Sequence, residues 1–261
     1  MSAPTLLVTR PQPQADAWVA RLSELGVTAV ALPLLAIAGA PDPAAVAEAW
    51  RGLAAQDLVM FVSPNAVQQF FSDLSADQAA WPSHTLAGST GPGTASALAA
   101  AGVPPALIVS PSAESGQFDT EALWLALQPM RDWAGARVLV VRGDGGRDWL
   151  ADTLSDVGAS LTFVTAYRRL VPDWQPSEHA LLAQAQAAPH DHIWLFSSSQ
   201  ALRHLRQIAP DADWSASLAI ATHPRIAEAV STAGFGQVLQ APPTPQAVAS
   251  ALTRSIQSCP P

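Results

Sequence analysis

Short apolar runs alternate with longer amphipathic stretches along most of the chain, and this alternation predicts its secondary structure. Amphipathic stretches that open with Pro, Ser, Asp or Thr and close near a Gly predict helices between nearly every pair of apolar runs. An alternation of this kind is typical of α/β proteins with parallel sheets flanked by helices. The apolar runs predict strands at Thr5–Thr9, Thr28–Leu32, Leu58–Val62, Thr85–Ser89, Ala106–Val109, Arg137–Arg142, Leu161–Val164, His192–Phe196, Leu218–Ala221 and Gln237–Leu239.

The pattern also repeats within the chain. Residues 6–26 resemble residues 138–158, and residues 86–102 resemble residues 218–234, both at a spacing of 132. Self-similarity at a fixed spacing indicates two copies of one structural unit of roughly 125 residues.

The linker-like stretches do not lie between the two copies. They are AGAPDP at 38–43 and LVPDWQP at 170–176, each inside a copy. We therefore expect two lobes, one formed by residues 1–37 with 170–261 and the other by residues 38–169. Two chain crossings would form a two-stranded connection between the lobes, with a cleft between them.

Composition narrows the classes of protein that fit. Hydrophobic residues make up 49% of the 261 residues and charged residues 13%, which is typical of a globular chain. No apolar run approaches the length of a membrane span, and the N-terminus lacks the pattern of a secretory signal. The single cysteine, Cys259, excludes an internal disulfide and a multi-cysteine zinc site. We expect a cytoplasmic protein without a membrane partner.

The charged residues restrict the chemistry further. The net charge is −8 and no basic run occurs, so a nucleic-acid partner is not expected. All 13 basic residues are arginines. Without lysine, the chain cannot form a Schiff base, hold pyridoxal phosphate covalently or complete a P-loop.

Six loops follow predicted strands and open helices, and they are rich in small hydroxyls, glycine and arginine. In open α/β sheets, ligands bind beyond the carboxyl ends of the strands, and free N–H groups at helix starts bind carboxylates or phosphates. Each loop taken alone also fits an ordinary helix cap. The loops are TRP at 9–11, SPN at 63–65, STGPGT at 89–94, RGDGGR at 142–147, SSSQ at 197–200 and THPR at 222–225.

Three other kinds of site find weaker support. RGDGGR lacks the spacing of a dinucleotide fingerprint. His190 and His192 are two residues apart at a strand start, which allows a metal site, but a solvated loop explains them as well. Ser63 and the serines at 197–199 have no recognisable base to make them nucleophiles.

Tyr167 is the single tyrosine of the chain and lies at a predicted crossing. One interpretation is an aromatic side chain packed against the crossing with its hydroxyl at the surface. The other is a phenol that faces the cleft and donates a hydrogen bond to a leaving group.

The motifs and their order resemble those of the uroporphyrinogen-III synthase family over essentially the whole chain. Each motif is weak alone, and the order and spacing make the resemblance specific. They are TRP at 9–11, DLVMFVSPNAV at 57–67, GPGTA at 91–95, VVRGDGGR at 140–147, AYRR at 166–169, FSSS at 196–199 and the closing PPTPQAVASAL.

The resemblance implies a cytoplasmic enzyme of tetrapyrrole biosynthesis, a cofactor-free carbon–oxygen lyase that acts as a monomer. Its small-molecule substrate, the linear tetrapyrrole hydroxymethylbilane, carries eight carboxylates. Loss of the terminal hydroxyl as water gives an electrophilic azafulvene, and closure through a spiro intermediate inverts ring D. Uncatalysed closure gives the uninverted isomer I, so the enzyme's main task is geometric.

The resemblance also implies roles for individual residues. Tyr167 matches the family's tyrosine and is expected to donate a proton to the departing hydroxyl. The chain departs from the family where many relatives read GPTTA, because His223-Pro224-Arg225 stands there; His223 or Arg225 is expected to contact a carboxylate instead. Arg168 is a further expected carboxylate contact. The other expected substrate-binding residues are Arg10, Ser63, Thr90, Gly91, Arg142, Gly143, Arg147, Ser197 and Ser198.

The alternative from another class is a non-catalytic, two-lobed binder of small anions. Such proteins share the hinge and the cleft. They normally carry a signal peptide or a DNA-binding segment, and we expect neither here.

Overall fold

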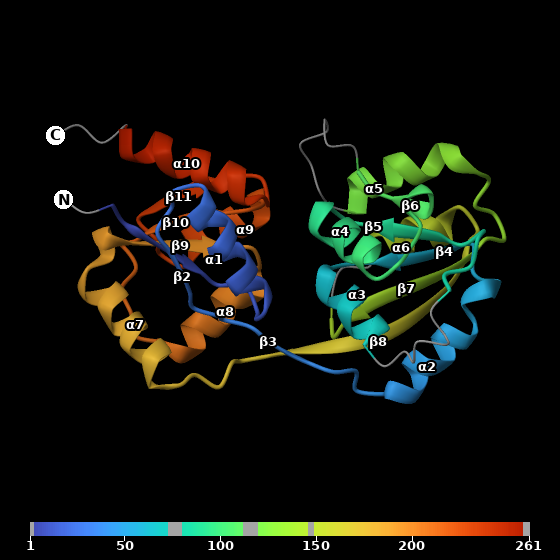
Figure 1. Ribbon diagram of the computed structural model, residues 1–261, viewed down its shortest axis with the longest axis horizontal. Coiled ribbons are helices and arrows are strands. Elements are labelled where there is room, and N and C mark those ends of the chain that lie inside the picture. Colours follow the sequence, from blue (N-terminus) through green and yellow to red (C-terminus); the bar gives the residue numbers. More distant parts are fainter. Residues whose placement is uncertain (1–2, 73–79, 112–119, 146–148, 258–261) are drawn as a thin grey trace. The chain divides into compact units, whose positions relative to one another are not determined.

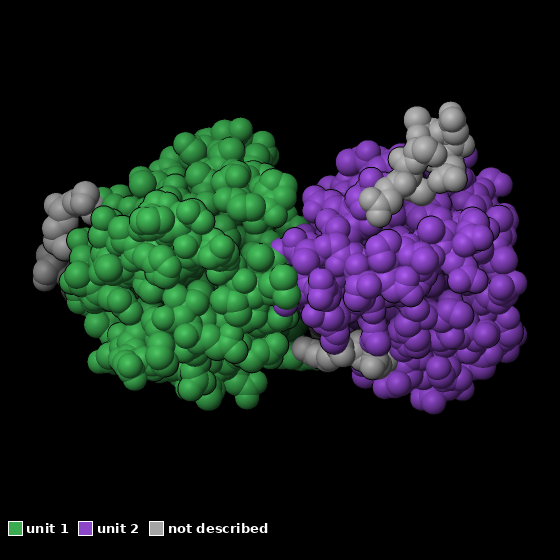
Figure 2. Space-filling model, turned by 90° about the horizontal axis from the view of Figure 1, so that it is seen from below, with its two compact units in different colours: residues 1–36, 170–261 green, residues 37–169 purple. Residues whose placement is uncertain are grey.

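The computed structural model describes residues 3–72, 80–111, 120–145 and 149–257. The chain divides into two compact units (Figure 2): residues 1–36 with 170–261 form unit 1, and residues 37–169 form unit 2. No helix in the described ranges is long and apolar enough to cross a membrane.

Unit 1 is built on a five-stranded sheet in the order β11-β10-β9-β1-β2, and every neighbouring pair in it is parallel (Figure 1). Its strands are β1 (Thr5–Val8), β2 (Ala29–Ala31), β9 (His192–Phe196), β10 (Leu218–Ala221) and β11 (Gln237–Gln240). Its helices are α1 (Gln14–Glu24), α7 (Pro176–Ala187), α8 (Ser199–Ile208), α9 (Pro224–Thr232) and α10 (Pro245–Gln257), with a 3₁₀ turn η6 (Pro189–Asp191).

Successive residues of these strands face opposite sides of the sheet, and each side has its own core. Leu7 and Trp194 belong to a core that includes residues of α7, α8 and α9. Leu6 and Ile193, one residue earlier on the same strands, belong to a core with α1 and α10. The sheet is therefore covered on both faces, which explains why its strands read as continuous apolar runs.

Unit 2 is built on a six-stranded sheet in the order β3-β8-β7-β4-β5-β6 (Figure 1). Its strands are β3 (Ala36–Ala38), β4 (Leu58–Phe61), β5 (Leu86–Ser89), β6 (Ile108–Val109), β7 (Arg137–Gly143) and β8 (Ser160–Leu170). Its helices are α2 (Pro43–Arg51), α3 (Pro64–Phe71), α4 (Pro92–Ala100), α5 (Thr120–Leu127) and α6 (Trp149–Asp156), with 3₁₀ turns η1 (Leu53–Ala55), η3 (Pro105–Leu107) and η5 (Gln128–Met130).

The cores of unit 2 alternate in the same way. Val59 and Phe61 of β4 pack in a core with α2, α3 and α4, whereas Leu58 and Met60 pack in a core with α5 and α6. The predicted α/β class, with parallel sheets flanked by helices, is confirmed by the pairing of the β4, β5, β6, β7 and β8 strands and by the parallel sheet of unit 1.

Two predicted strands differ from the structure by more than one residue at an end. The strand predicted at Leu161–Val164 runs from Ser160 to Leu170, because β8 lies between β7 and β3 and is hydrogen-bonded to both. The strand predicted from Ala106 begins at Ile108, because Pro105–Leu107 forms a 3₁₀ turn. The strands that lie at the two chain crossings, β3 and β8, are neighbours in the sheet of unit 2.

Candidate functional site

The carboxyl ends of four parallel strands meet at one edge of the unit 2 sheet. In the order β8-β7-β4-β5, these strands lead to Tyr167, Gly143, Ser63 and Thr90. Residues that are up to about a hundred positions apart in the sequence are therefore neighbours, as the switch-point rule for α/β sheets predicts.

Tyr167 is the centre of this edge. Its side chain is fully buried, at 0% exposure, in the core that also contains Phe61 and Val141. Its hydroxyl oxygen lies 2.9 Å from Ser63 Oγ and accepts a hydrogen bond of 2.6 Å from Arg169 Nη2. The Arg169 guanidinium also lies over the phenol ring, 5.0 Å from its centroid.

The interpretation that placed the Tyr167 hydroxyl at the surface is therefore wrong. The physical reason is an irregularity in the β7–β8 pairing. Arg142 pairs with Thr165, but Gly143 pairs with Tyr167, so β8 has one extra residue here. A bulge of this kind redirects the side chains that follow it.

The predicted substrate contact of Gly143 stays a prediction, and the structure gives a separate reason for a glycine at this position. A Cβ atom at Gly143 would lie 2.6 Å from Cζ of Tyr167, so the phenol ring occupies the space that any other side chain would need. The main chain beside it holds both strands together: Asp144 N donates to Tyr167 O at 3.0 Å, and Arg169 N donates to Asp144 Oδ1 at 2.9 Å. The absence of a side chain at Gly143 thus leaves the space that the Tyr167 ring occupies.

The hydroxyls of this edge also serve the local backbone. Ser63 caps α3, with Oγ accepting from Ala66 N at 3.1 Å, and Thr90 Oγ1 donates to Val62 O at 3.2 Å. Gly91 precedes α4 as its N-cap, and its N–H donates to Ser89 Oγ at 3.3 Å. The helix-cap interpretation is confirmed for Ser63, and its half-buried side chain still reaches the phenol.

Three predicted arginines lie on or near β7 and β8, and the structure describes two of them. The guanidinium of Arg142 lies over the ring of Phe163, 4.7 Å from its centroid. Arg147 lies outside the described residues. Arg168 on β8 is exposed.

In unit 1, the carboxyl end of β1 carries a poorly solvated cation. Arg10 lies over the ring of Trp18 at 4.9 Å, and its Nη2 donates to Gln14 Oε1 at 3.1 Å. Its Nε is buried and has no hydrogen-bond partner among the described residues. Burial lowers the pKa of the Arg10 guanidinium to about 10. A buried donor without an acceptor is energetically costly and suits an anionic ligand.

The loops after the neighbouring strands β9 and β10 lead to the other substrate-binding residues predicted for unit 1. Ser198 caps α8, with Oγ accepting from Gln200 N at 3.1 Å, and the half-buried Ser197 precedes it. His223 caps α9, with Nδ1 accepting from Arg225 N at 3.2 Å. The cap interpretation is therefore confirmed for Ser198 and His223.

Arg225 also lines a surface cavity of about 380 Å³ between α8 and α9. Two further arginines, Arg203 and Arg206 on α8, line the same cavity, and Glu228 is its one acidic lining residue. Three positive charges around one hollow, in a chain of net charge −8, favour an anionic occupant. The cavity is also lined by Ser199, Leu202, Ala229 and Thr232.

The predicted site residues thus form two groups. Ser63, Thr90, Gly91, Arg142, Gly143 and Tyr167 lie in strands of unit 2 or in the loops after them, whereas Arg10, Ser197, Ser198, His223 and Arg225 lie in loops and a helix start after strands of unit 1. The predicted cleft that would join the groups stays a prediction. Arg169, Arg203 and Arg206 were not among the residues predicted from the sequence. The proximity of Arg169 to Tyr167 was a usable signal, but no motif marks the two arginines of α8.

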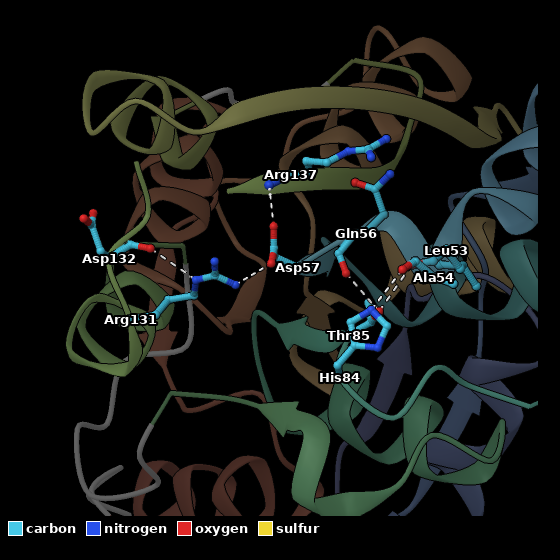
Figure 3. Close-up of polar contacts among 9 residues, drawn as sticks. All are labelled: Leu53, Ala54, Gln56, Asp57, His84, Thr85, Arg131, Asp132 and Arg137. Carbon is cyan, nitrogen blue, oxygen red and sulfur yellow. Dashed lines mark hydrogen bonds and ion pairs between the residues drawn. The ribbon is translucent and has the colours of Figure 1, made fainter. Parts of the chain in front are cut away.

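A second polar cluster lies at the opposite, amino-terminal edge of the unit 2 sheet (Figure 3). Asp57 accepts a hydrogen bond of 2.8 Å from Arg137 N and one of 2.5 Å from Arg131 Nη1. The hydrogen bond from Arg137 N, followed by Arg131, holds the pKa of the Asp57 carboxyl below its usual value. Thr85 Oγ1 donates to the carbonyls of Leu53 and Gln56 at 3.2 and 2.9 Å. These contacts join β7 to the loop before β4, and β5 to the loop before β4, so they stabilise this edge of the sheet.

Within the described ranges, no group of three His, Cys, Asp or Glu side chains could hold a metal ion. His192 Nδ1 lies 3.0 Å from Ala188 O, within its own turn, and His190 belongs to η6. His190 is exposed in this turn, as the solvated interpretation expects, and His192 is half-buried at the start of β9.

The chain is similar to known proteins over most of its length. The family model described as "Uroporphyrinogen-III synthase HemD" matches residues 16–250. A uroporphyrinogen-III synthase of Escherichia coli is 30% identical over 206 residues, which are 79% of this chain and 80% of that protein. One of Salmonella typhimurium is 32% identical over 186 residues, 68% and 70% of the two chains. A crystal structure of a mutant uroporphyrinogen III synthase from the extremely thermophilic bacterium Thermus thermophilus has the same fold, with a TM-score of 0.58 at 19% identity, covering 99% of this chain and 100% of that one.

Proposed function

The chain belongs to the uroporphyrinogen-III synthase family of tetrapyrrole biosynthesis, and on this premise we propose that it cyclises hydroxymethylbilane to uroporphyrinogen III with loss of water. Because a carbon–oxygen bond breaks without hydrolysis or redox change, the reaction is that of a carbon–oxygen lyase. We further propose that the protein acts in the cytoplasm as a monomer, without a cofactor or a nucleic-acid partner.

The observation that carries the proposal is the buried Tyr167, whose hydroxyl is held by Ser63 and Arg169 at the carboxyl edge of the unit 2 sheet. The reaction needs one proton donor for the departing hydroxyl, and an ordered phenol can supply it. No nucleophile is needed, because the electron pair of the pyrrole ring expels the hydroxyl. The absence of a recognisable nucleophile and base in the sequence is consistent with such a step.

Substrate binding requires cations for the substrate's carboxylates. Arg10 supports this requirement, because its buried Nε has no partner among the described residues and can donate to a carboxylate. The cavity with Arg203, Arg206 and Arg225 adds a second concentration of positive charge in the same unit. We propose that these arginines bind carboxylates, and that backbone N–H groups before α3, α4, α8 and α9 assist them.

The geometric part of the reaction is the inversion of ring D. Spontaneous closure joins the chain ends directly and gives isomer I, so the enzyme must hold the substrate in a conformation from which the substituted carbon of ring D is attacked. Fixed contacts to several carboxylates can impose such a conformation and accelerate one closure over the other.

An assay of product isomers tests the proposal. The purified protein is incubated with freshly prepared hydroxymethylbilane, the products are oxidised to porphyrins, and isomers I and III are separated by chromatography. We expect isomer III in excess over the isomer I of an enzyme-free control. A product mixture identical to that control would contradict the proposal and favour a non-catalytic anion binder.

The Tyr167→Phe variant tests the assignment of the proton donor. It removes one hydroxyl from a buried ring that otherwise keeps its packing, so we expect a turnover lower by about 10²–10⁴-fold with the fold retained. Wild-type turnover in a folded Tyr167→Phe protein would contradict the assignment.

A further inference from the structure

The hydroxyl of Tyr167 is buried and is held by two neighbouring side chains. Tyr167 is 0% exposed, and its hydroxyl contacts Ser63 and Arg169. Ser63, by contrast, is half-buried and lies in the loop between β4 and α3. A proton that leaves Tyr167 therefore has a hydroxyl group between itself and the solvent-accessible edge of the sheet.

The direction of the hydrogen bonds follows from what each group can do. A guanidinium only donates, so the Tyr167 oxygen accepts from Arg169 Nη2 at 2.6 Å. The remaining partner of the phenol is Ser63 Oγ at 2.9 Å. If the phenol did not donate to Ser63, its buried O–H would have no acceptor among the residues that the structure describes, which is unfavourable. The phenol proton therefore points to Ser63 Oγ.

The same argument determines where the proton of Ser63 points. Ser63 Oγ accepts from Ala66 N at 3.1 Å as the cap of α3, and it also accepts from the phenol. A serine hydroxyl has two acceptor positions and one donor hydrogen. With both acceptor positions occupied, its own O–H is left to donate away from the cluster.

We propose that Ser63 is the catalytic residue that delivers the proton to the departing hydroxyl, and that Tyr167 replenishes it. The inference rests on the proposed function and assigns the proton's route within it. The C–O bond of the substrate breaks with its electron pair on oxygen, and this oxygen takes the Ser63 proton and leaves as water. Ser63 takes the Tyr167 proton at the same time, and the pyrrole electron pair forms the exocyclic double bond of an azafulvenium ion.

The charge and the proton then return to their starting places. The Tyr167 phenolate is stabilised by the guanidinium 2.6 Å away. The spiro intermediate then fragments and recloses at the unsubstituted α-carbon of ring D, and the proton that this carbon loses passes through Ser63 back to Tyr167. Water is released and no net proton is consumed, so the step needs no further reactant.

Arg169 is a positioning residue in this relay. Its backbone N–H donates to Asp144 Oδ1 at 2.9 Å, and its Nη1 donates to Asp144 O at 3.3 Å. These bonds hold the guanidinium so that Nη2 occupies one side of the phenol oxygen, which leaves the phenol O–H directed at Ser63.

Two substitutions at one position separate the relay from the structural role of Ser63. Ser63→Thr keeps both the helix cap and a hydroxyl, whereas Ser63→Asn keeps the cap and removes the hydroxyl. We expect Ser63→Thr to retain single-turnover activity within about tenfold of wild type, and Ser63→Asn to lose about 10²–10⁴-fold, as Tyr167→Phe does. If the serine only caps α3, both variants will be active.

Two controls complete the experiment. Asp42→Ala removes the cap of α2 in the same unit, where Asp42 Oδ1 accepts from Ala44 N and Ala45 N, and it should leave turnover unchanged. The double variant Ser63→Asn/Tyr167→Phe should be no slower than either single variant, because both interrupt one relay. Equal activity of the Thr and Asn variants, or losses that multiply in the double variant, would overturn the relay.

A measurement on the unmodified protein keeps the test decisive if a variant does not fold. Single-turnover rates in mixtures of H₂O and D₂O should curve downward with the deuterium fraction, because two protons move in the step. A linear dependence would indicate one moving proton and overturn the proposal. Failure of the wild-type protein to form isomer III would instead refute the proposed function, so the two outcomes are distinguishable.

Discussion

The Gly143→Ala substitution tests whether turnover depends on the space that Gly143 leaves for the Tyr167 ring. A methyl group there would lie 2.6 Å from Cζ, 2.7 Å from one ring Cε atom and 3.0 Å from the other. Carbon atoms in contact are separated by about 3.5–4.0 Å, so the ring must retreat by about 1 Å. The φ angle of Gly143 is not in the left-handed region, so backbone strain does not contribute.

The size of the effect follows from this displacement. A retreat of about 1 Å stretches the 2.9 Å contact between Tyr167 and Ser63 beyond the range of a hydrogen bond. Misplacing a catalytic group by this much lowers the rate by about 10²-fold. Overpacking of a buried site lowers the free energy of unfolding by about 1–3 kcal/mol.

The assay is single-turnover formation of uroporphyrinogen III, normalised to folded protein, together with urea denaturation. Gly88→Ala is the matched control, because its Cβ would lie 3.3 Å from Leu58 Cδ1, a flexible side chain of the same sheet. We expect the control to lose stability without losing turnover. Wild-type turnover in Gly143→Ala, or equal losses of turnover in both variants, would refute the reasoning.

Further predictions concern pH, the buried cation and the arginine cavity. Asp57→Asn should lower the free energy of unfolding by about 1 kcal/mol at pH 7. The folded-state pKa of Asp57 lies below its unfolded value, so the stability difference between wild type and variant should vanish as the pH falls from about 4 through the folded-state pKa. A stability difference that stays constant in urea denaturation between pH 7 and pH 3 would contradict this prediction. Arg10→Met should raise the free energy of unfolding by roughly 1–3 kcal/mol, since it removes a buried donor that has no partner among the described residues, and it should also raise KM. A destabilised variant with an unchanged KM would refute the assignment of Arg10 as a carboxylate contact. Arg203→Ala with Arg206→Ala should raise KM and weaken its dependence on salt at constant kcat, whereas Arg254→Ala, on α10, should not. An equal effect of all three substitutions would indicate net charge instead of a binding cavity.

Much of the fold could be predicted because its signal is local. Strands buried on both faces, such as Leu58–Phe61 and His192–Phe196, are short apolar runs that end at helix-capping residues. The end of β8 at Leu170 lies beyond the apolar run at Leu161–Val164, because residues 165–170 mix polar and apolar side chains and are strand through pairing with neighbours. The bulge at Gly143 is likewise a property of two strands, so neither strand alone reveals it.

The candidate site was predicted as a set of loops, because the residues that mark strand ends can be recognised in the sequence. Small hydroxyls and glycines after apolar runs mark strand ends, and parallel strands bring those ends to one edge. Ser63, Thr90 and Gly143 were predicted in this way, and Tyr167 was singled out because the chain has no second tyrosine. What each side chain does at the edge depends on distances between strands, which the sequence does not contain.

The sequence by itself determined the family, the α/β class, the acidic lysine-free chemistry and the strand ends that carry polar residues, because each is written in local patterns or in motif order. Only the tertiary structure decided that Tyr167 is buried, that Gly143 makes room for its ring and that Arg169 and Ser63 share its hydroxyl. It also decided that Arg203 and Arg206 join Arg225 around one cavity. Those facts arise from a bulge between two strands and from the packing of two helices, and such contacts exist only after the chain has folded.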